Sequence, residues 1–364
     1  MTLDDIVGAL HSAHQSQTPL RLCGHGSKDF YGGMLSGEPL DILAHRGILA
    51  YEPTELYLTA RCGTLLAEIE AALAENGQML AFEPPHFAGN VAVDRNIAAK
   101  TGATLGGCIA AGLSGPRRMQ VGAVRDFVLG VKLVDGTGQV LNFGGQVMKN
   151  VAGYDVSRLL AGSLGTLGVI AEATVKVLPR PVAETTLEFT CSADEAVQRL
   201  NAWGGQPLPI SASFWFEGRL WVRLSGAAAA VAAATRKLGG KSAVDAEKWW
   251  ISVREQTHPG FVAPVLWRLS VPSTTPDLPL AGLRAIEWGG ALRWYAADLP
   301  AAEVRAAAAA VGGHATLYRA PESLRCREDA FTPLSPALLA LHRRLKKAFD
   351  PAGILNPGRL YAEF

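Results

Sequence analysis

The stretch "ATLGGCIAAGLSGPRR", residues 103–118, carries glycines at 106, 107, 112 and 115 in a run that is otherwise apolar enough to be core. Glycine adopts positive φ without steric penalty, and its missing Cβ lets backbone N–H groups approach an anion or a flat ring. Such a stretch suits a pyrophosphate or a flavin better than it suits a packed core. Ordinary turns between strands remain an equally good interpretation of one such cluster alone.

Two more glycine clusters lie on either side of this stretch. "CGHGSKDFYGG" (23–33) follows the short β-like run "PLRLC", so that Gly24, Gly26 and Ser27 could form a turn whose amides point at a diphosphate, with Lys28 nearby. "KNVAGYDVSRLLAGSLGTLGVI" (149–170) adds Gly153 and the three glycines of "GSLGTLG" before another β-branched run. Several backbone donors would thus converge on one ligand.

Composition limits the class of protein. The chain has 364 residues with 49% hydrophobic content, enough for a large core and two domains. Lys plus Arg total 34 against 33 Asp plus Glu, and this balance gives no broad basic field for nucleic acid or anionic membrane. The acidic, amphipathic start resembles no signal peptide and no run is long enough to span a bilayer, so we expect a cytoplasmic protein.

Pattern divides the chain into three parts. Residues 1–180 alternate β-branched runs with helical stretches such as "LLAEIEAALAENG", and the prolines of "LPRPV" then end the first domain. Residues 181–330 combine strands with alanine-rich helices, which predicts a smaller antiparallel α+β cap domain. Residues 331–364 form a basic helix and an irregular tail that should pack back on the first domain. The fold class is α+β.

Other common sites fail on spacing. No GxxxxGK[ST] phosphate loop occurs, and "GHGSKD" supplies only the first two glycines of a Rossmann fingerprint. The eight histidines include no HExxH or HxH arrangement, so no metal site is predicted, and His11 and His14 are assigned to a solvated helix face. The five cysteines are scattered singly, which excludes a CxxC-based zinc site and an iron-sulfur cluster held by this chain alone.

Three segments together resemble FAD-binding proteins of the vanillyl-alcohol oxidase type, the PCMH flavoprotein family. These are "PLRLCGHGSKDFYGG" (19–33), the stretch 103–181 and "FDPAGILNPGRLY" (349–361), and their order and spacing make the resemblance specific. It covers essentially the whole chain and is strongest over 101–181. It implies a PCMH-type FAD-binding domain of two α/β subdomains plus the cap. Within the family, the chain is most similar to FAD-binding subunits of bacterial glycolate oxidase complexes.

The resemblance also implies which residues hold the cofactor, a noncovalently bound FAD. The first glycine loop would wrap the pyrophosphate, the second would line pyrophosphate and isoalloxazine, and the third would meet the adenosine half. The implied FAD-binding residues are Gly24, His25, Gly26, Ser27, Lys28, Pro84, Gly106, Gly107, Cys108, Gly112, Ser114, Gly115, Arg118, Gly122, Gly165, Gly168, Val169 and Ile170.

Departures from the family pattern bear on catalysis. Relatives that oxidise 2-hydroxy acids tend to read "GSEGTLG", with histidines and a glutamate in a longer cap that bind metal and substrate, whereas Leu164 stands here in place of that acid. His258 and His314 lie far apart in the sequence, so no catalytic residue is assigned. Some proteins of this fold attach FAD covalently through a histidine near the place of His25, but the glycolate oxidase pattern implies no such bond.

Two functions therefore stay open. The first is an accessory FAD-binding subunit of a complex that oxidises glycolate to glyoxylate. Its implied partners are a larger homologous FAD subunit and an iron-sulfur subunit, at the inner face of the membrane through that complex. The second is a self-sufficient FAD-dependent 2-hydroxy-acid dehydrogenase of glycolate or lactate type. The four tryptophans at 215, 221, 249 and 250 fit either core, a substrate pocket or a docking face.

Overall fold

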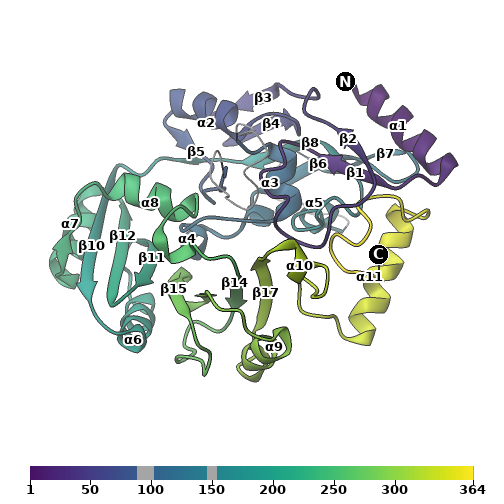
Figure 1. Ribbon diagram of the computed structural model, residues 1–364. Coiled ribbons are helices and arrows are strands. Elements are labelled where there is room, and N and C mark those ends of the chain that lie inside the picture. The colour runs from purple at the N-terminus through teal and green to yellow at the C-terminus, as the bar shows by residue number, and fades with distance from the viewer. Residues whose placement is uncertain (88–101, 146–153, 364) are drawn as a thin grey trace.

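Two antiparallel sheets organise the computed structural model, which describes residues 1–87, 102–145 and 154–363 (Figure 1). Gly153 lies outside the described residues. The first sheet has five strands in the order β3-β4-β8-β6-β7, and the second has eight in the order β13-β10-β12-β11-β15-β16-β14-β17. Strands β1 and β2 pair in parallel, and β5 pairs with β9. This mixture of helices and sheets confirms the predicted α+β class.

The base of the molecule, as we call the part that ends with β9, surrounds the five-stranded sheet. Its elements are α1 (Leu3–Ser16), β1 (Leu20–Cys23), β2 (Glu38–Asp41), β3 (Ile48–Glu52), β4 (Tyr57–Arg61), α2 (Leu66–Glu75), β5 (Gln78–Met79), α3 (Leu105–Ala111), α4 (Arg118–Val121), η1 (Val124–Asp126), β6 (Val128–Val134), β7 (Val140–Gly144), α5 (Val156–Leu159), β8 (Val169–Lys176) and β9 (Leu178–Pro179).

Local sequence explains where the first helix begins and which face it buries. Thr2 caps α1 by accepting from the backbone N–H of Asp5, whose carboxylate accepts from the N–H of Thr2 in return. Ile6 and Leu10 lie one turn apart and are fully buried, which stabilises each by about 1.5–3 kcal/mol relative to exposure. The predicted helical stretch at residues 65–77 forms as α2, with Ile69 in the core.

The cap, as we call the part from β10 to β17, contains the eight-stranded sheet. Its elements are β10 (Ala183–Thr190), α6 (Ala193–Gly204), β11 (Ile210–Phe216), β12 (Arg219–Gly226), α7 (Ala228–Leu238), β13 (Lys241–Ser242), α8 (Ala246–Arg254), η2 (Pro259–Phe261), β14 (Leu266–Ser270), β15 (Leu283–Glu287), η3 (Trp288–Gly290), β16 (Leu292–Tyr295), α9 (Ala301–Ala310) and β17 (His314–Arg319).

The two faces of the cap sheet bury different surfaces, because successive strand residues point to opposite sides. Helices α6, α7 and α9 cover the outer face, away from the base (Figure 1). The inner face packs on the base, where Phe214, Trp294 and Tyr318 share one core cluster with Tyr31 and Leu164. The loop after β1, which contains Tyr31, and the turn before β8, which contains Leu164, therefore lie against the inner face of the cap.

The cap tryptophans divide between the two faces. Trp250 is buried on the inner side and donates from Nε1 to Thr186 Oγ1 at 2.9 Å. Trp215 is half-buried in the outer core and donates to the Cys191 carbonyl at 3.0 Å. Trp221 and Trp249 are half-buried and stack with ring centroids 4.7 Å apart. These four side chains are packing residues of the cap.

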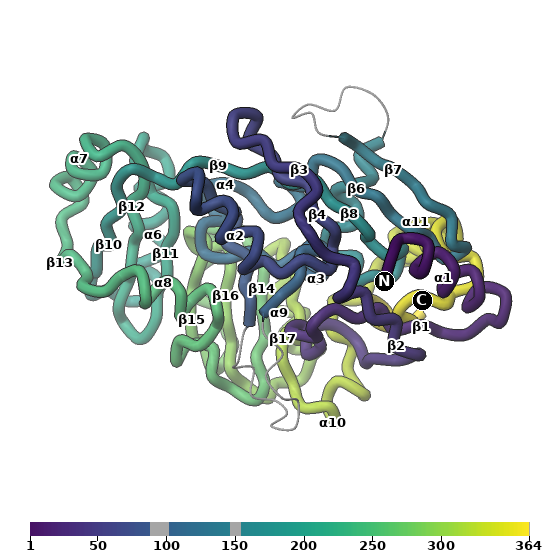
Figure 2. Tube along the Cα trace, turned by 90° about the horizontal axis from the view of Figure 1, so that it is seen from above, coloured from purple at the N-terminus to yellow at the C-terminus, as the bar shows by residue number. Residues whose placement is uncertain are grey.

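The C-terminal segment returns to the base through α10 (Glu322–Arg325) and α11 (Pro336–Phe349). Lys346 of α11 is buried and donates from Nζ to Asp350 at 2.7 Å and to the carbonyls of Thr166 and Leu355 at 2.8 Å. Leu355 then pairs in parallel with Leu20 of β1. Figure 2 shows α11 beside α1 and β1, at the end of the molecule opposite the cap. No helix within the described ranges is long and apolar enough to cross a bilayer.

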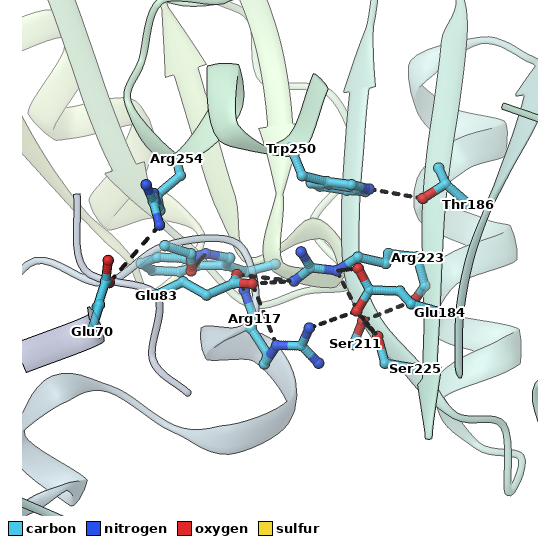
Figure 3. Close-up of polar contacts among 12 residues, drawn as sticks. Glu70, Glu83, Arg117, Glu184, Thr186, Ser211, Arg223, Ser225, Trp250 and Arg254 are labelled. Atoms are coloured by element: carbon cyan, nitrogen blue, oxygen red, sulfur yellow. Dashed lines mark hydrogen bonds and ion pairs between the residues drawn. The ribbon is translucent and has the colours of Figure 1, made fainter. Parts of the chain in front are cut away.

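An ion network joins base and cap (Figure 3). Glu83 and Arg117 of the base meet Glu184 of β10 and Arg223 of β12, with Arg223 2.8 Å from Glu83 and Arg117 2.8 Å from Glu184. Burial opposes the ionisation of Glu83, but Arg223 and Arg117 outweigh it, and the pKa of Glu83 lies below its usual value. Glu83 is therefore ionised at neutral pH, and the orientation of the cap depends on the pairing of opposite charges in this network.

We predict that Arg223→Met lowers the free energy of unfolding by about 3–5 kcal/mol, because it leaves Glu83 buried without its closest cation. Arg219→Met is the matched control on the same strand, since its guanidinium is 60% exposed and pairs with Glu188 at 3.0 Å. Loss of that surface ion pair should lower the free energy of unfolding by less than about 1 kcal/mol. Urea unfolding measures both. Equal losses in the two variants would contradict the role given to the network.

A second prediction concerns His258, whose ring lies 5.0 Å from both Phe214 and Phe216. Burial lowers the pKa of His258 to about 4. Since the unfolded chain binds this proton more readily, stability should fall as the pH drops from 6.5 towards 4, by at most about 1.4 kcal/mol per pH unit. His258→Asn keeps an acceptor for the Gly260 N–H, which His258 caps at 3.1 Å. Urea unfolding at pH 7 and pH 5 should show a smaller loss in this variant than in the wild type.

Candidate cofactor cleft

A cleft opens between β1, α3, the start of β8 and the C-terminal tail. It holds about 820 Å³ of space between protein atoms, part of it open to solvent. The residues that line it are Leu22, Cys23, Gly24, His25, Gly26, Ser27, Lys28, Asp29, Leu35, Ile42, Thr104, Gly106, Gly107, Ala110, Ala111, Leu164, Gly165, Gly168, Val169, Ile170, Asn356 and Arg359.

The loop after β1 forms one wall and is held by its own backbone. Gly26 has a φ of 69°, and its carbonyl accepts from the N–H of Asp29 at 3.1 Å. A Cβ on Gly26 would come 2.9 Å from the Asp29 carboxylate, which can move aside, so the positive φ is what favours glycine here. The turn keeps Ser27 and Lys28 at the cleft.

Helix α3 forms the opposite wall. Thr104 caps it, accepting from the Gly107 N–H at 3.2 Å. A Cβ on Gly106 would lie 2.8 Å from the Cβ of Cys62, so Gly106 allows the helix to pack on the base core. Gly107 is different, because its Cβ would meet only Thr104 Oγ1 at 3.1 Å and would otherwise point into open space. The missing side chain of Gly107 therefore leaves open space at the cleft.

The C-terminal tail closes the cleft by linking its other walls. Asn356 accepts from the Leu22 N–H at 2.7 Å and donates from Nδ2 to the Leu164 carbonyl at 2.6 Å. Arg359 donates to the carbonyls of Gly33 and Lys28, in the loop after β1. A Cβ on Gly33 would collide with the Gly358 carbonyl, so loop and tail are in direct backbone contact.

The electrostatics of the cleft favour an anion. Lys28 is 9% exposed, lies 5.3 Å from the Phe87 ring centroid and contacts Ser27 Oγ at 3.4 Å. Burial lowers the pKa of Lys28, partly offset by Cys108 and Glu255. His25 presents a buried Nδ1 with no hydrogen-bond partner in the structure as described. Arg359 adds a second cation at the same wall, although burial lowers its pKa to about 10. A diphosphate could satisfy these groups.

A second, narrower cavity lies between the base and the inner face of the cap. It holds about 340 Å³ including its opening to solvent. Its lining comprises Pro85, Leu113, Ser114, Gly115, Pro116, Val253, Arg254, Gln256, Arg268, Glu287, Trp288, Leu292, Trp294 and Tyr318. The described residues contain no group of three or more His, Cys, Asp or Glu side chains placed to hold a metal ion.

Comparison with known proteins places the chain in a family. The description "FAD binding domain" matches residues 1–144, and "FAD linked oxidases, C-terminal domain" matches residues 330–360. The chain is 46% identical over 355 residues to glycolate oxidase subunit GlcE of Escherichia coli (strain K12), covering 97% of this chain and 96% of that one. The chain belongs to this family of FAD-linked oxidases. It is an FAD-dependent oxidoreductase protein with FAD as its cofactor.

Other FAD-linked oxidases match over shorter segments. Glycolate oxidase subunit GlcD of Bacillus subtilis (strain 168) is 44% identical over 84 residues, or 23% of this chain and 18% of that one. D-lactate dehydrogenase of Archaeoglobus fulgidus is 28% identical over 214 residues, or 58% of this chain and 45% of that one. Among solved structures, an alkyldihydroxyacetonephosphate synthase matches with a TM-score of 0.61 at 14% identity, covering 97% of this chain and 75% of that one. This last likeness supports the PCMH-type fold alone.

The cleft suits the FAD of this family. One wall carries cations and glycine-loop amides at the positions where an anion can approach, and the other walls offer the apolar side chains of Leu22, Ile42 and Ile170 to a flat ring. Among the residues that the structure describes, the buried His25 Nδ1 has no hydrogen-bond partner, and there is space in front of Gly107. A bound group could occupy both places.

The structure separates the predicted FAD-binding residues into two sets. Eleven of them line the cleft together: Gly24, His25, Gly26, Ser27, Lys28, Gly106, Gly107, Gly165, Gly168, Val169 and Ile170. The rest lie elsewhere. Cys108 is buried in the base core, Ser114 and Gly115 line the second cavity, and Pro84 lines neither cavity.

Four of the predicted residues outside the cleft have structural roles in the base. Gly112 ends α3 with a φ of 68°, and Gly122 ends α4 with a φ of 98°. The guanidinium of Arg118 lies 4.2 Å from the Trp288 ring centroid. Ser114 accepts from the Val124 N–H at 3.0 Å. These positions shape the base, and their contact with the cofactor stays a prediction.

Sequence reasoning missed the tail residues Asn356 and Arg359, which lie more than 300 positions from the loop they hold. The terminal segment "ILNPGRLY" belonged to the family resemblance, so that segment was the available signal. It identified a stretch of chain, but no rule of local spacing could place its side chains at the cleft.

We predict that Gly107→Val abolishes FAD binding without unfolding the chain, because the branched side chain would fill the cleft while clashing with nothing but Thr104 Oγ1. Gly8→Val is the control, since Gly8 also lies exposed in a helix and has no atom within 4 Å of its Cβ. Flavin absorbance after purification with added FAD, together with circular dichroism, measures both properties. Normal FAD binding by Gly107→Val would remove α3 from the cofactor site.

Proposed function

We propose that this chain is an FAD-holding subunit of a complex that oxidises glycolate to glyoxylate. The observation that carries the proposal is the 46% identity to GlcE across 97% of this chain, because a match of that length includes base, cap and tail together. The shorter match to GlcD is consistent with a larger homologous FAD subunit as its partner. The complex would supply the substrate chemistry and the electron acceptor.

Each part of the chain would have its own role in holding FAD. Residues 1–180 form the FAD-binding domain, residues 181–330 form the cap that covers it, and residues 331–364 fasten the first glycine loop. Lys28 and the amides of Gly24–Ser27 would bind the pyrophosphate, with Gly106 and Gly107 allowing close approach. Bound FAD supplies two-electron oxidation of an organic substrate. The cap and the tail would exclude water from it.

The proposal assigns an accessory role because the described residues offer no evident base for a hydroxy acid. His258 sits among aromatic rings and is neutral at physiological pH, since burial lowers its pKa to about 4. His314 begins β17 at the far edge of the cap sheet. Leu164, with a φ of 52°, lines the cleft where an acid stands in self-sufficient relatives. Proton removal would thus occur in the partner.

Electron transfer out of the complex would require another subunit. The free cysteines of this chain include the buried Cys62, Cys108 and Cys191 and the exposed Cys326, which belong to separate parts of the fold. An iron-sulfur cluster needs several converging thiolates. We therefore propose an iron-sulfur subunit as the second partner, and the cytoplasmic face of the membrane as the location of the complex.

The experiment is purification of the chain alone and with its partners. Alone, it should carry FAD that acid precipitation releases, and glycolate should not bleach the flavin. Co-expression with a GlcD-type subunit and a cysteine-rich subunit should give a stable complex with glycolate-dependent dye reduction, and omission of this chain should abolish that activity. Rapid bleaching of the isolated chain by glycolate would instead support a self-sufficient 2-hydroxy-acid dehydrogenase. Flavin retained by the precipitate would indicate a covalent link at His25.

A further inference from the structure

Helix α11 packs one side on the base and leaves the other side exposed. Leu345 and Phe349 pack against the core of the five-stranded sheet, and Lys346 is buried beside Asp350. The helix lies at an outer edge of the molecule (Figure 1). Its exposed residues, which we call the outer face of α11, include Ala337, Leu338, Ala340, Leu341, Arg343, Arg344, Lys347 and Ala348. The solvent side of a surface helix is normally polar, so the leucines of this face require an explanation.

Two leucines form the apolar part of the outer face. Leu338 and Leu341 are three residues apart, so their side chains are neighbours on the helix surface. Leu338 is 49% exposed and Leu341 is 56% exposed. Ala337 lies one turn before Leu341 and extends the same apolar strip. Single exposed leucines are common on protein surfaces, whereas an adjacent pair on one helix favours a contact surface.

Three cations border the leucines. Arg343, Arg344 and Lys347 are exposed, and the helix contains no Asp or Glu from its first residue to its last. The chain as a whole is nearly balanced, with 34 Lys plus Arg against 33 Asp plus Glu. The positive charge of the outer face is therefore a local feature of α11. Leucines and cations without acids are complementary to a surface that is both apolar and anionic.

We propose that the outer face of α11 docks reversibly on an anionic phospholipid surface. Leu338 and Leu341 would enter the boundary between headgroups and acyl chains, and the three cations would bind the headgroup phosphates. Helices with leucines on one side and Arg or Lys beside them lie in the plane of such interfaces. A protein partner would need a groove matched to these leucines, whereas a bilayer deforms around them. The inference deepens the proposed function, on which it rests for the membrane location of the complex.

The expected attachment is weak and sensitive to salt. Each basic side chain close to an anionic leaflet strengthens binding about fivefold, and this attraction is screened over about 8 Å at physiological ionic strength. The tail that closes the cofactor cleft follows α11 directly, with Asn356 and Arg359 in the cleft lining. Docking through α11 would thus hold the base, and with it the cleft, next to the bilayer, while the cap lies at the opposite end of the molecule (Figure 2).

The test measures cosedimentation of the full chain, purified alone, with vesicles of phosphatidylglycerol and phosphatidylcholine in equal amounts. The chain should bind these vesicles but not vesicles of phosphatidylcholine alone, and about 0.5 M salt should release it. Leu338→Ser together with Leu341→Ser should weaken binding about tenfold, because the two half-exposed leucines no longer leave water. Arg343→Gln, Arg344→Gln and Lys347→Gln combined should weaken it about a hundredfold.

Two variants of the cap serve as matched controls. Ile251→Ser removes an apolar side chain that is 43% exposed on α8. Arg236→Gln combined with Lys237→Gln removes two exposed cations from the last turn of α7. Both should bind the anionic vesicles as the wild type does. Circular dichroism and FAD uptake, measured on every variant, show whether a loss of binding comes from unfolding.

The comparison of the two vesicle types needs no substitution. Equal binding of both types by the wild type, or binding of neither, would overturn the proposal. Undiminished binding by both α11 variants would overturn it as well. If the wild type ignores vesicles while the α11 variants fail to assemble with the GlcD-type subunit, the outer face is a protein interface and the lipid assignment is wrong.

Failure of this docking is distinguishable from failure of the proposed function, because vesicle binding by the chain alone requires neither FAD nor glycolate. A chain that binds vesicles through α11 but forms no glycolate-oxidising complex would refute the proposed function and keep the lipid contact. A complex that oxidises glycolate, built from a chain that does not bind anionic vesicles, would refute the docking alone.

Discussion

One asparagine links the chain segments that form the cofactor cleft. Asn356 accepts from the Leu22 N–H with its side-chain oxygen and donates to the Leu164 carbonyl with its side-chain nitrogen. The first hydrogen bond fixes β1, which precedes the first glycine loop, and the second fixes the turn before β8. An amide carries its donor and its acceptor on separate atoms of one short side chain, and Asn356 also adopts a φ of 42°, which asparagine tolerates better than most residues. The width of the cleft thus depends on the chain end.

The tail reaches this position because three cations of the C-terminal segment find hydrogen-bond acceptors there. Lys346 donates to Asp350 and to the Leu355 carbonyl, which shapes the turn after α11. Arg359 and Arg325 donate to carbonyls of the loop after β1, including that of Gly33. Buried cations without such acceptors would cost several kcal/mol each. The loop after β1 is therefore ordered by contacts from outside it.

A different set of contacts positions the cap on the base. The Glu83–Arg117–Glu184–Arg223 network fixes its orientation on the base, while Phe214, Trp294 and Tyr318 supply apolar contact area. The cost of desolvation makes such networks a weak source of net stability. Any arrangement that separates one charged group from its partners is nevertheless higher in free energy, because that charge is then uncompensated. The same interface contains the second cavity, which Arg268 and Glu287 line. Precise docking of the cap therefore determines which cap side chains face the base.

The sequence by itself determined the α+β class, the extent of the glycine clusters and the identity of the cofactor as FAD. Backbone φ preferences, the spacing of hydrophobic residues and the three family segments can all be recognised in short stretches of the chain. It predicted β1, α2, β6, β8 and α11 from such patterns, and it grouped Gly24–Lys28 with Gly106, Gly107 and Gly165–Ile170, which the fold brings to one cleft.

Only the tertiary structure decided the remaining placements. It separated Ser114 and Gly115 from that cleft, buried Cys108, and turned Arg118 towards Trp288. It also brought Asn356 to Leu22 and set Arg268 beside Glu287, from strands that do not follow one another in their sheet. Spacing along a chain specifies which residues share a turn or a strand face. Contacts between distant segments depend on how sheets dock and on which buried charges must meet, and no local pattern encodes that.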